Sequence, residues 1–176
     1  RPPRSTLFPY TTLFRSDETG VELANINTDD QVVISGDKIA VARAMDLASA
    51  RGAKKTIPLP VSGAFHSSLM FEAASGLADA VQALNFKEPK MPIVGNCDSR
   101  LLSTSDEIRS ELVNGLCQCV QWKDSVRHLV DSGVTQFVEF GSGGVLAGLI
   151  KRIDRGVKVS TVSDTASMRK LADDGA

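Results

Sequence analysis

The sequence has few cysteines, no long apolar run and almost no net charge, and each shortage excludes a class of protein. Three cysteines among 176 residues form no disulfide framework, which favours a reducing cytoplasm. No apolar run approaches the ~18–20 residues that a membrane span requires. The 20 Lys and Arg residues balance 21 Asp and Glu residues, so the chain has no general electrostatic footprint for nucleic acid or an anionic membrane. What is present, 42% hydrophobic and 23% charged residues, is typical of one globular domain or two small ones.

Two motifs that commonly bind metals or phosphates are incomplete in this sequence. Cys117-Gln118-Cys119 has no second Cys/His cluster to complete a metal site. The glycine turn at residues 141–144 lies between a predicted strand and a predicted helix, as in phosphate cradles. However, it lacks the Lys-Ser/Thr of a P-loop and the spacing of a dinucleotide fingerprint. We therefore expect no metal and no cofactor, and we interpret the glycines as allowing close backbone packing.

The first 16 residues, RPPRSTLFPYTTLFRS, differ from the rest of the chain. They have no helical or strand period, and they lack the regions of a signal peptide. The run from Thr6 to Ser16 resembles the conceptual translation of a sequencing-library adapter. We therefore set residues 1–20 apart as a non-native or disordered leader, and we expect that the amino-terminal part of the natural protein is missing.

From Val21 onward, periodicity and turn residues predict alternating strands and helices. Two β-prone runs, 21–26 and 31–35, predict a hairpin, and Asp37 can cap a helix that ends near Gly52. The remaining predicted strands are 56–61, 91–94, 134–140 and 157–162, with a turn and loop at 96–102. The remaining predicted helices are 67–84, 122–132, 145–153 and 167–172, and a further one that contains residues 108, 112 and 113. Ser103, Thr104 or Ser105 can cap that helix, and Gly115 weakens it near its end. This alternation indicates an α/β fold, with the early β-β-α-β portion separable as an α+β subdomain.

The stretch LPVSGAFHSSLM, residues 59–70, contains one of only two histidines. A predicted strand leads into a turn at His66, and Ser67 can cap the helix that follows. The amides and dipole of a first helical turn disfavour an imidazolium, so we expect His66 to be neutral near pH 7 and able to act as a general base. The alternative is a structural histidine whose ring bonds a nearby carbonyl. His128 is predicted to lie on the polar side of its helix, as a solvated residue.

From Val21 to its end, the chain resembles the carboxy-terminal half of the malonyl-CoA:acyl-carrier-protein transacylases. Four stretches carry the resemblance: ANINTDDQVVISG (24–36), GAKKTIPLPVSGAFHSSLM (52–70), VQW (120–122) and VEFGSGGVLAGLIKRI (138–153). The resemblance implies an incomplete α/β-hydrolase-like acyltransferase large subdomain (62–176) with a truncated ferredoxin-like small subdomain (21–61). A truncated small subdomain would leave apolar surface on the helix after Asp37 without cover.

The same resemblance implies a Ser–His mechanism that passes a malonyl group through a malonyl-serine intermediate to a carrier-protein thiol. His66 matches the family's catalytic base, and Gly115 stands where members commonly have a glutamine whose main-chain carbonyl orients that histidine. Phe65 matches the AFH form associated with malonyl selection. Asn25 and Asn27 are further substrate-binding candidates, with a plain turn role as the alternative. These 176 residues contain no GHSxG elbow, so we expect the chain to be inactive alone.

The resemblance also implies partners and alternatives. It implies acyl carrier protein and malonyl-CoA as partner and substrate, a monomeric complete enzyme, and no cofactor, nucleic acid or membrane. One alternative is the malonyl-selective acyltransferase domain of a polyketide synthase. Another, from a different class, is a non-enzymatic α/β binding module.

Overall fold

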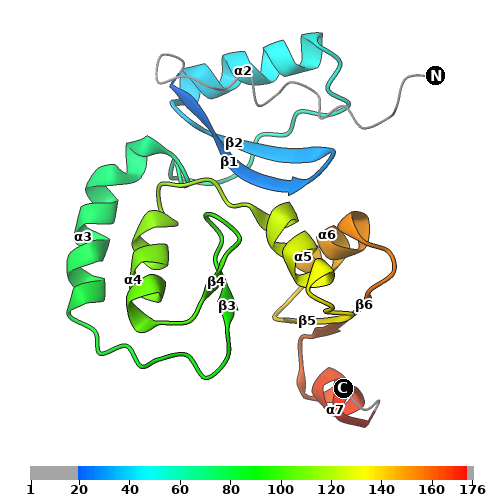
Figure 1. Ribbon diagram of the computed structural model, residues 1–176. Coiled ribbons are helices and arrows are strands. Elements are labelled where there is room, and N and C mark those ends of the chain that lie inside the picture. The colour runs from blue at the N-terminus through cyan, green and yellow to red at the C-terminus, as the bar shows by residue number, and fades with distance from the viewer. Residues whose placement is uncertain (1–19, 174–176) are drawn as a thin grey trace.

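The computed structural model describes residues 20–173 (Figure 1). Of the predicted leader, only residue 20 lies inside this range. The elements are β1 (Val21–Thr28), β2 (Gln31–Gly36), α2 (Lys38–Ala50), the 3₁₀ turn η1 (Ser68–Met70), α3 (Phe71–Gln82), β3 (Ile93–Val94), β4 (Leu101–Leu102), α4 (Ser105–Asn114), α5 (Trp122–Asp131), β5 (Gln136–Phe140), α6 (Val145–Ile153), β6 (Lys158–Val162) and α7 (Thr165–Asp173). Helices and strands alternate along most of the chain, as the sequence predicts. Among the helices of residues 20–173, none is long and apolar enough to cross a membrane.

The first hairpin and its helix confirm the prediction for residues 21–52. β1 and β2 pair antiparallel, and the carboxylate of Asp37 caps α2 by accepting the N–H groups of Ile39 and Ala40 at 2.9 and 3.0 Å. The helix stops before Gly52, whose φ of +93° lies in the left-handed region. α2 packs along the hairpin (Figure 1) and exposes Ile39 and Leu47 by 64% and 51%. Apolar side chains of this helix are therefore uncovered, as expected.

The strand predicted at 56–61 is absent, and this prediction was wrong. Residues 53–67 contain no helix or strand, and the apolar side chains at 57, 59 and 61 are exposed. Pro58 and Pro60 have no backbone N–H to donate. No strand among residues 20–173 pairs with this segment to accept hydrogen bonds from its other N–H groups. The β-prone composition therefore gives only an extended segment.

The helix after His66 also differs from its prediction. A 3₁₀ turn precedes α3, which spans 71–82 instead of the predicted 67–84. Ser67 makes no capping bond, because its hydroxyl donates to the carbonyl oxygen of Ala64 at 2.6 Å. The buried Ser67 side chain closes the preceding turn and leaves the helix amides to another partner.

A short hairpin connects α3 to α4. The predicted strand 91–94 is shortened to β3, and it pairs antiparallel with β4 inside the segment that we predicted as turn and loop. Leu102 of β4 is 1% exposed, so its burial draws the chain back beside β3 after the turn at 96–100. Thr104 then begins α4 with a capping box formed with Glu107.

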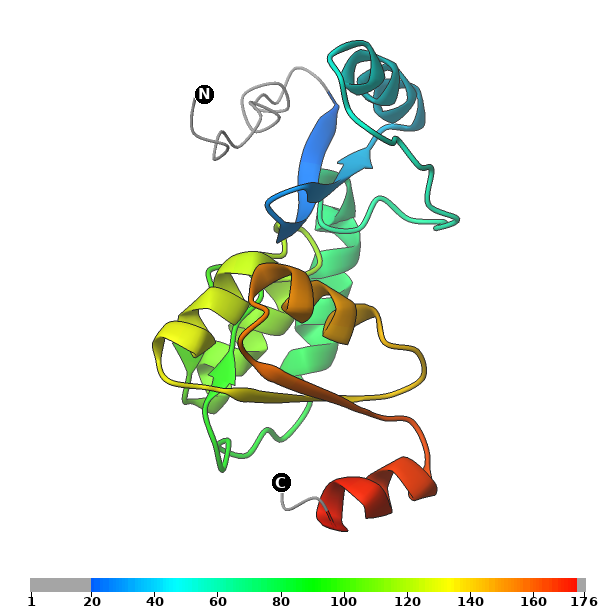
Figure 2. The ribbon, with the colours of Figure 1, turned by 90° about the vertical axis from the view of Figure 1, so that its right-hand side faces the viewer.

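The carboxy-terminal part of the described chain matches its prediction closely. β5 and β6 pair parallel, and α5 and α6 lie on the same side of this pair (Figure 2). The core there consists of buried Val126, Ile150 and Val157, with Trp122, Val130, Phe137, Ile153 and Val159 packed around them. α7 follows β6 and extends the predicted helix 167–172 at both ends.

Ion pairs connect the tip of the first hairpin to this carboxy-terminal part. Asp29 pairs with Arg127 at 2.9 Å and with Lys123 at 3.4 Å, and Asp30 pairs with Arg152 at 2.6 Å. The hydroxyl of Thr28 and the Arg152 guanidinium lower the pKa of Asp30 below its usual range. Contacts at the hairpin tip thus join segments that are 94 to 122 residues apart in the sequence.

Candidate active site

His66 lies in a turn that is held by two consecutive carbonyl groups. Its backbone N–H donates to the oxygen of Leu116 at 2.9 Å, and its ring Nδ1 lies 2.7 Å from the oxygen of Gly115. Both carbonyls follow directly on the last residue of α4. His66 has a φ of +61°, and among residues 20–173 only Ser99 is another non-glycine residue with positive φ. A side chain in this backbone region persists only when its surroundings fix it, and such residues concentrate at functional sites.

The contact with Gly115 sets the tautomer of the imidazole. A carbonyl oxygen only accepts, so Nδ1 carries the proton and Nε2 keeps a free lone pair. The residue is half-buried and is not enclosed by packing. The imidazole thus makes the bond to a nearby carbonyl that a structural histidine would make. It also keeps Nε2 free to accept a proton, as a general base requires.

Gly115 contributes only its backbone. Its φ of −59° is open to any residue, so glycine is not required here for conformational reasons. A Cβ at this position would lie 3.0 Å from the carbonyl oxygen of Glu111, a tight contact that needs a small shift of the helix end. The predicted contact between the carbonyl of residue 115 and the ring of His66 is present, and its orienting role in catalysis stays a prediction.

A carboxylate from β1 holds the other side of the turn. Glu22 Oε1 accepts hydrogen bonds from the backbone N–H of Ser68 at 2.8 Å and from its hydroxyl at 2.5 Å. Ser68 begins the 3₁₀ turn η1, which leads from His66 into α3. We did not single out Glu22 from the sequence, although it is the only charged residue in β1.

Phe65 presents an apolar ring next to His66. The side chain is 45% exposed, and the ring lies against Gly63, where an added Cβ would come within 2.8 Å of it. Gly63 is therefore needed for this ring position. The Phe65 ring is therefore a partly uncovered apolar surface on the residue that precedes His66.

Asn25 and Asn27 are placed differently from each other. Asn25 forms a parallel bridge with Val120, through the bonds Ile26 N–H to Val120 O at 2.9 Å and Val120 N–H to Ala24 O at 2.8 Å. This bridge joins β1 to the segment that holds His66. Asn27 lies two residues further along β1, and in residues 20–173 neither side-chain amide forms a hydrogen bond. The structure thus brings His66, Gly115 and Phe65 together and connects Asn25 to them through the backbone.

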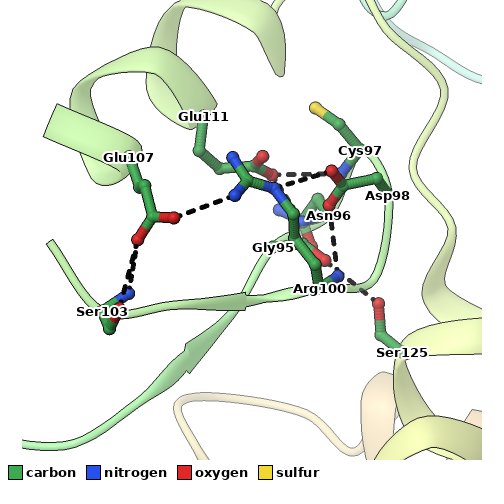
Figure 3. Close-up of polar contacts among 9 residues, drawn as sticks. All are labelled: Gly95, Asn96, Cys97, Asp98, Arg100, Ser103, Glu107, Glu111 and Ser125. Atoms are coloured by element: carbon green, nitrogen blue, oxygen red, sulfur yellow. Dashed lines mark hydrogen bonds and ion pairs between the residues drawn. The ribbon is translucent and has the colours of Figure 1, made fainter.

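A cluster of polar contacts fixes α4, the helix that carries Gly115 at its end (Figure 3). Glu111 accepts the N–H groups of Asn96 and Cys97 at 2.5 and 3.1 Å. Glu107 accepts from Arg100 and from the backbone N–H of Ser103, both at the β3–β4 hairpin. Backbone hydrogen bonds from Ser103 and Thr104 lower the pKa of Glu107 to about 2. These hydrogen bonds therefore hold α4 against the β3–β4 hairpin.

The cysteines are unsuited to act as nucleophiles at neutral pH. Burial and the nearby Glu111 carboxylate raise the pKa of Cys97 to about 12, and burial raises the pKa of Cys119 to about 11. Burial also raises the pKa of Cys117. The thiolate is the reactive form, so these thiols are inert. Residues 20–173 contain no group of three or more His, Cys, Asp and Glu side chains that could hold a metal ion.

The glycine turn at 141–144 has a different role from the one we predicted. Nothing lies within 4 Å of a Cβ added at Gly141, Gly143 or Gly144, so close backbone packing is wrong as the explanation. Gly141 and Gly143 have φ values of +137° and +100°, which side chains rarely adopt. Glu139 accepts the N–H groups of Leu146 and Ala147 at 3.1 and 2.9 Å. The chain's own carboxylate thus occupies the helix terminus that a phosphate would need.

His128, the second histidine, is exposed on α5, as predicted.

Comparison with known proteins identifies what this arrangement resembles. The malonyl CoA-acyl carrier protein transacylase of Bacillus subtilis (strain 168) is 40% identical over 144 residues, which cover 82% of this chain and 45% of that protein. The protein of the same name from Staphylococcus aureus (strain MSSA476) is 37% identical over 147 residues, which cover 84% of this chain and 48% of the relative. The chain is a homologue of these malonyl transacylases over most of its own length. It spans about half the length of the curated relatives that it matches. No family model matches it.

Solved malonyl transacylase structures share the fold of this homologue. A malonyl-transacylase in complex with its type II polyketide synthase acyl-carrier protein has a TM-score of 0.88 and 36% identity, and the match covers 96% of this chain and 54% of that one. The acyl carrier protein S-malonyltransferase of Vibrio cholerae has a TM-score of 0.82 and 38% identity, with 86% and 49% covered. The expected α/β acyltransferase fold is therefore confirmed, for about half of its length.

Proposed function

We propose that this chain serves the transfer of a malonyl group from CoA to the thiol of an acyl carrier protein in fatty-acid biosynthesis, with His66 as the general base. The observation that carries the proposal is the 2.7 Å contact between Nδ1 of His66 and the carbonyl oxygen of Gly115. It leaves Nε2 as the proton acceptor in a chain whose relatives bear the name malonyl CoA-acyl carrier protein transacylase.

The proposed reaction has two transfers at one serine. Nε2 of His66 takes the proton from the serine hydroxyl while its oxygen attacks the malonyl thioester, and the imidazolium then returns the proton to the departing CoA thiolate. In the second transfer His66 takes the proton of the carrier-protein thiol, whose sulfur attacks the malonyl-serine ester. The proton then returns to the serine oxygen. No cofactor is consumed, because malonyl-CoA is itself the substrate.

The chain's own groups support the base in this scheme. The Gly115 carbonyl accepts from Nδ1–H throughout, and it stabilises the imidazolium that forms in each step. Phe65 provides an apolar wall for the acyl group, and Asn25 and Asn27 offer unpaired amides to a thioester or carboxylate. We divide the chain into a small subdomain at 21–61 and a large one from 62 onward, with His66 just beyond the boundary.

In this proposal the nucleophilic serine comes from a polypeptide segment other than these 176 residues. The sequence contains no GHSxG elbow, so we expect no turnover from these 176 residues alone. We further propose a cytoplasmic setting, which is supported by the free state of all three cysteines. The expected monomeric state of the active enzyme belongs to the same proposal.

The test is to join residues 20–176 to the amino-terminal half of the Bacillus subtilis relative and to measure malonyl transfer from CoA to acyl carrier protein. In this fusion, His66→Ala should lower kcat on the order of a million-fold, as removal of the catalytic histidine does in a serine protease. The matched control is His128→Ala, which changes the other, exposed histidine and should leave the rate within about twofold. Equal rates for His66→Ala and the parent fusion would remove His66 from the mechanism. A parent fusion with no measurable transfer would instead favour a non-enzymatic binding module.

A second candidate has a specific observation in its favour. One structural neighbour is a malonyl-transacylase bound to the carrier protein of a type II polyketide synthase. The same chemistry in this chain would then load a polyketide carrier. Assaying the fusion with a fatty-acid carrier protein and a polyketide carrier protein separates the two, because the natural partner should give the higher kcat/KM.

A further inference from the structure

The start of the helix after His66 is bound by a residue that is distant in sequence. Glu22 lies in β1, 46 residues before Ser68, and one of its carboxylate oxygens accepts both the backbone N–H and the hydroxyl of Ser68. Hydrogen bonds to an ionised acceptor are roughly twice as strong as neutral ones. Burial is the main cause of the raised pKa of Cys117, and the charge of Glu22 adds to it, so Glu22 also lies near the turn after α4. Its carboxylate therefore binds the segment after His66 and lies near the segment that binds the His66 side chain.

These contacts form a closed loop around the histidine. β1 is joined to Val120 by two backbone hydrogen bonds. In the same segment, residue 115 binds the imidazole of His66 and residue 116 binds its backbone. His66 continues into Ser68, and Ser68 returns to β1 through Glu22. Without Glu22 this loop of contacts is open on one side. The restraints that remain on His66 are the two carbonyls after α4 and the hydrogen bond from the Ser67 hydroxyl to the Ala64 carbonyl.

We propose that Glu22 is a positioning residue for His66. It acts through Ser68 to keep the His66 backbone at φ +61° and to keep Nδ1 against the Gly115 carbonyl. A backbone in this region is held only by over-determined surroundings, and Glu22 supplies the restraint that comes from β1. The inference rests on the proposed role of His66, since the Nδ1–H tautomer is what presents Nε2 as a base.

The test is nuclear magnetic resonance on the whole chain with ¹⁵N-labelled histidine. The chain has two histidines, so exposed His128 serves as an internal reference. In the parent chain we expect one tautomer at His66, with the proton on Nδ1. In Glu22→Ala we expect both tautomers, and exchange of the His66 amide hydrogen should be faster by roughly tenfold, the effect of losing a hydrogen bond to a charged group. Glu22→Gln keeps an oxygen that accepts both bonds and should restore the parent signals to within about twofold.

The matched control is Glu139→Ala, which removes a carboxylate from the start of α6 in the same way. It should leave the His66 signals unchanged. Unchanged His66 signals in Glu22→Ala, or an equal change in Glu139→Ala, would overturn the proposal. If Glu22→Ala does not fold, Ser68→Ala decides, because it removes the hydroxyl bond and keeps the backbone one. It should give an intermediate change, and an unchanged His66 would overturn the role. No activity is measured, so this result is independent of the transfer assay.

Discussion

The corner at His66 and the corner at Gly141 both lead an extended segment into a helix, and both have a carboxylate at the helix start, yet they are held differently. At the second corner, Glu139 binds amides that lie 7 and 8 residues further along the chain. At the first, Glu22 and Gly115 reach Ser68 and His66 across 46 and 49 residues. The glycine corner is thus defined by local sequence, and the His66 corner by the assembled fold. His66, the proposed base, thus lies at the corner that is held by residues distant in the sequence.

The largest expected effect comes from breaking the backbone hydrogen bond that joins β1 to Val120. Val120→Pro removes the N–H that donates to the buried Ala24 carbonyl and leaves that oxygen without its partner. We expect the free energy of unfolding to fall by about 2 kcal/mol and the His66 amide to exchange faster. Urea unfolding and hydrogen exchange measure the two changes.

Val120→Thr is the matched control for this substitution, because it keeps the N–H and the branched shape. It should stay close to the parent chain in both measurements. Parent-like exchange of the His66 amide in Val120→Pro would show that the His66 corner does not depend on β1.

An intermediate effect is expected at the local corner. Glu139→Ala removes the acceptor for two amides at the start of α6, which should cost about 1 kcal/mol, the usual value of a lost helix cap. Glu139→Gln retains an acceptor and should lose less. Urea unfolding measures the stability. The assignment would be contradicted if Glu139→Gln were less stable than Glu139→Ala.

The smallest effect should appear as a pH dependence at the start of α4, the helix whose end holds His66. Backbone hydrogen bonds hold the pKa of Glu107 at about 2, below its ordinary 4.5. A depressed pKa gives stability that is present above the ordinary value and is lost as the pH falls toward 2. The free energy of unfolding should therefore decrease less between pH 5 and pH 2 in Glu107→Gln than in the parent chain.

The matched control for Glu107 is Asp131→Asn, a change at an exposed carboxylate that forms no hydrogen bond or ion pair in residues 20–173. Its acid dependence should follow the parent chain. Identical slopes for Glu107→Gln and the parent would exclude a contribution from the capping box.

The predictions made from sequence succeeded where local rules decide the structure. Asp37 caps α2, and the apolar periodicity of α5 and α6 set their bounds closely. The predictions failed where a strand forms, or does not form, because of a partner that is distant in the sequence or absent. The β-prone run at 56–61 has two prolines and no neighbouring strand, and Leu101 pairs with β3 because Leu102 is buried.

At the candidate site, local sequence identified the residue and its neighbours but not its restraints. His66 was distinguished by its turn, and the contact with Gly115 was expected only from the family resemblance. Glu22 was missed because a single acidic residue in a strand gives no signal until the fold brings Ser68 beside it. Long-range hydrogen bonds between backbone and side chain carry no sequence period, so pattern analysis cannot find them.

A main-chain oxygen as the partner of Nδ1 makes position 115 tolerant of sequence drift, because every amino acid supplies the same atom. Evolution can exchange the side chain there and lose only what a small adjustment of the helix end costs. Insertion of one residue within α4 is another matter, since it turns everything beyond it by about 100° around the helix axis. The length of this helix, more than its composition, is what selection would have to preserve.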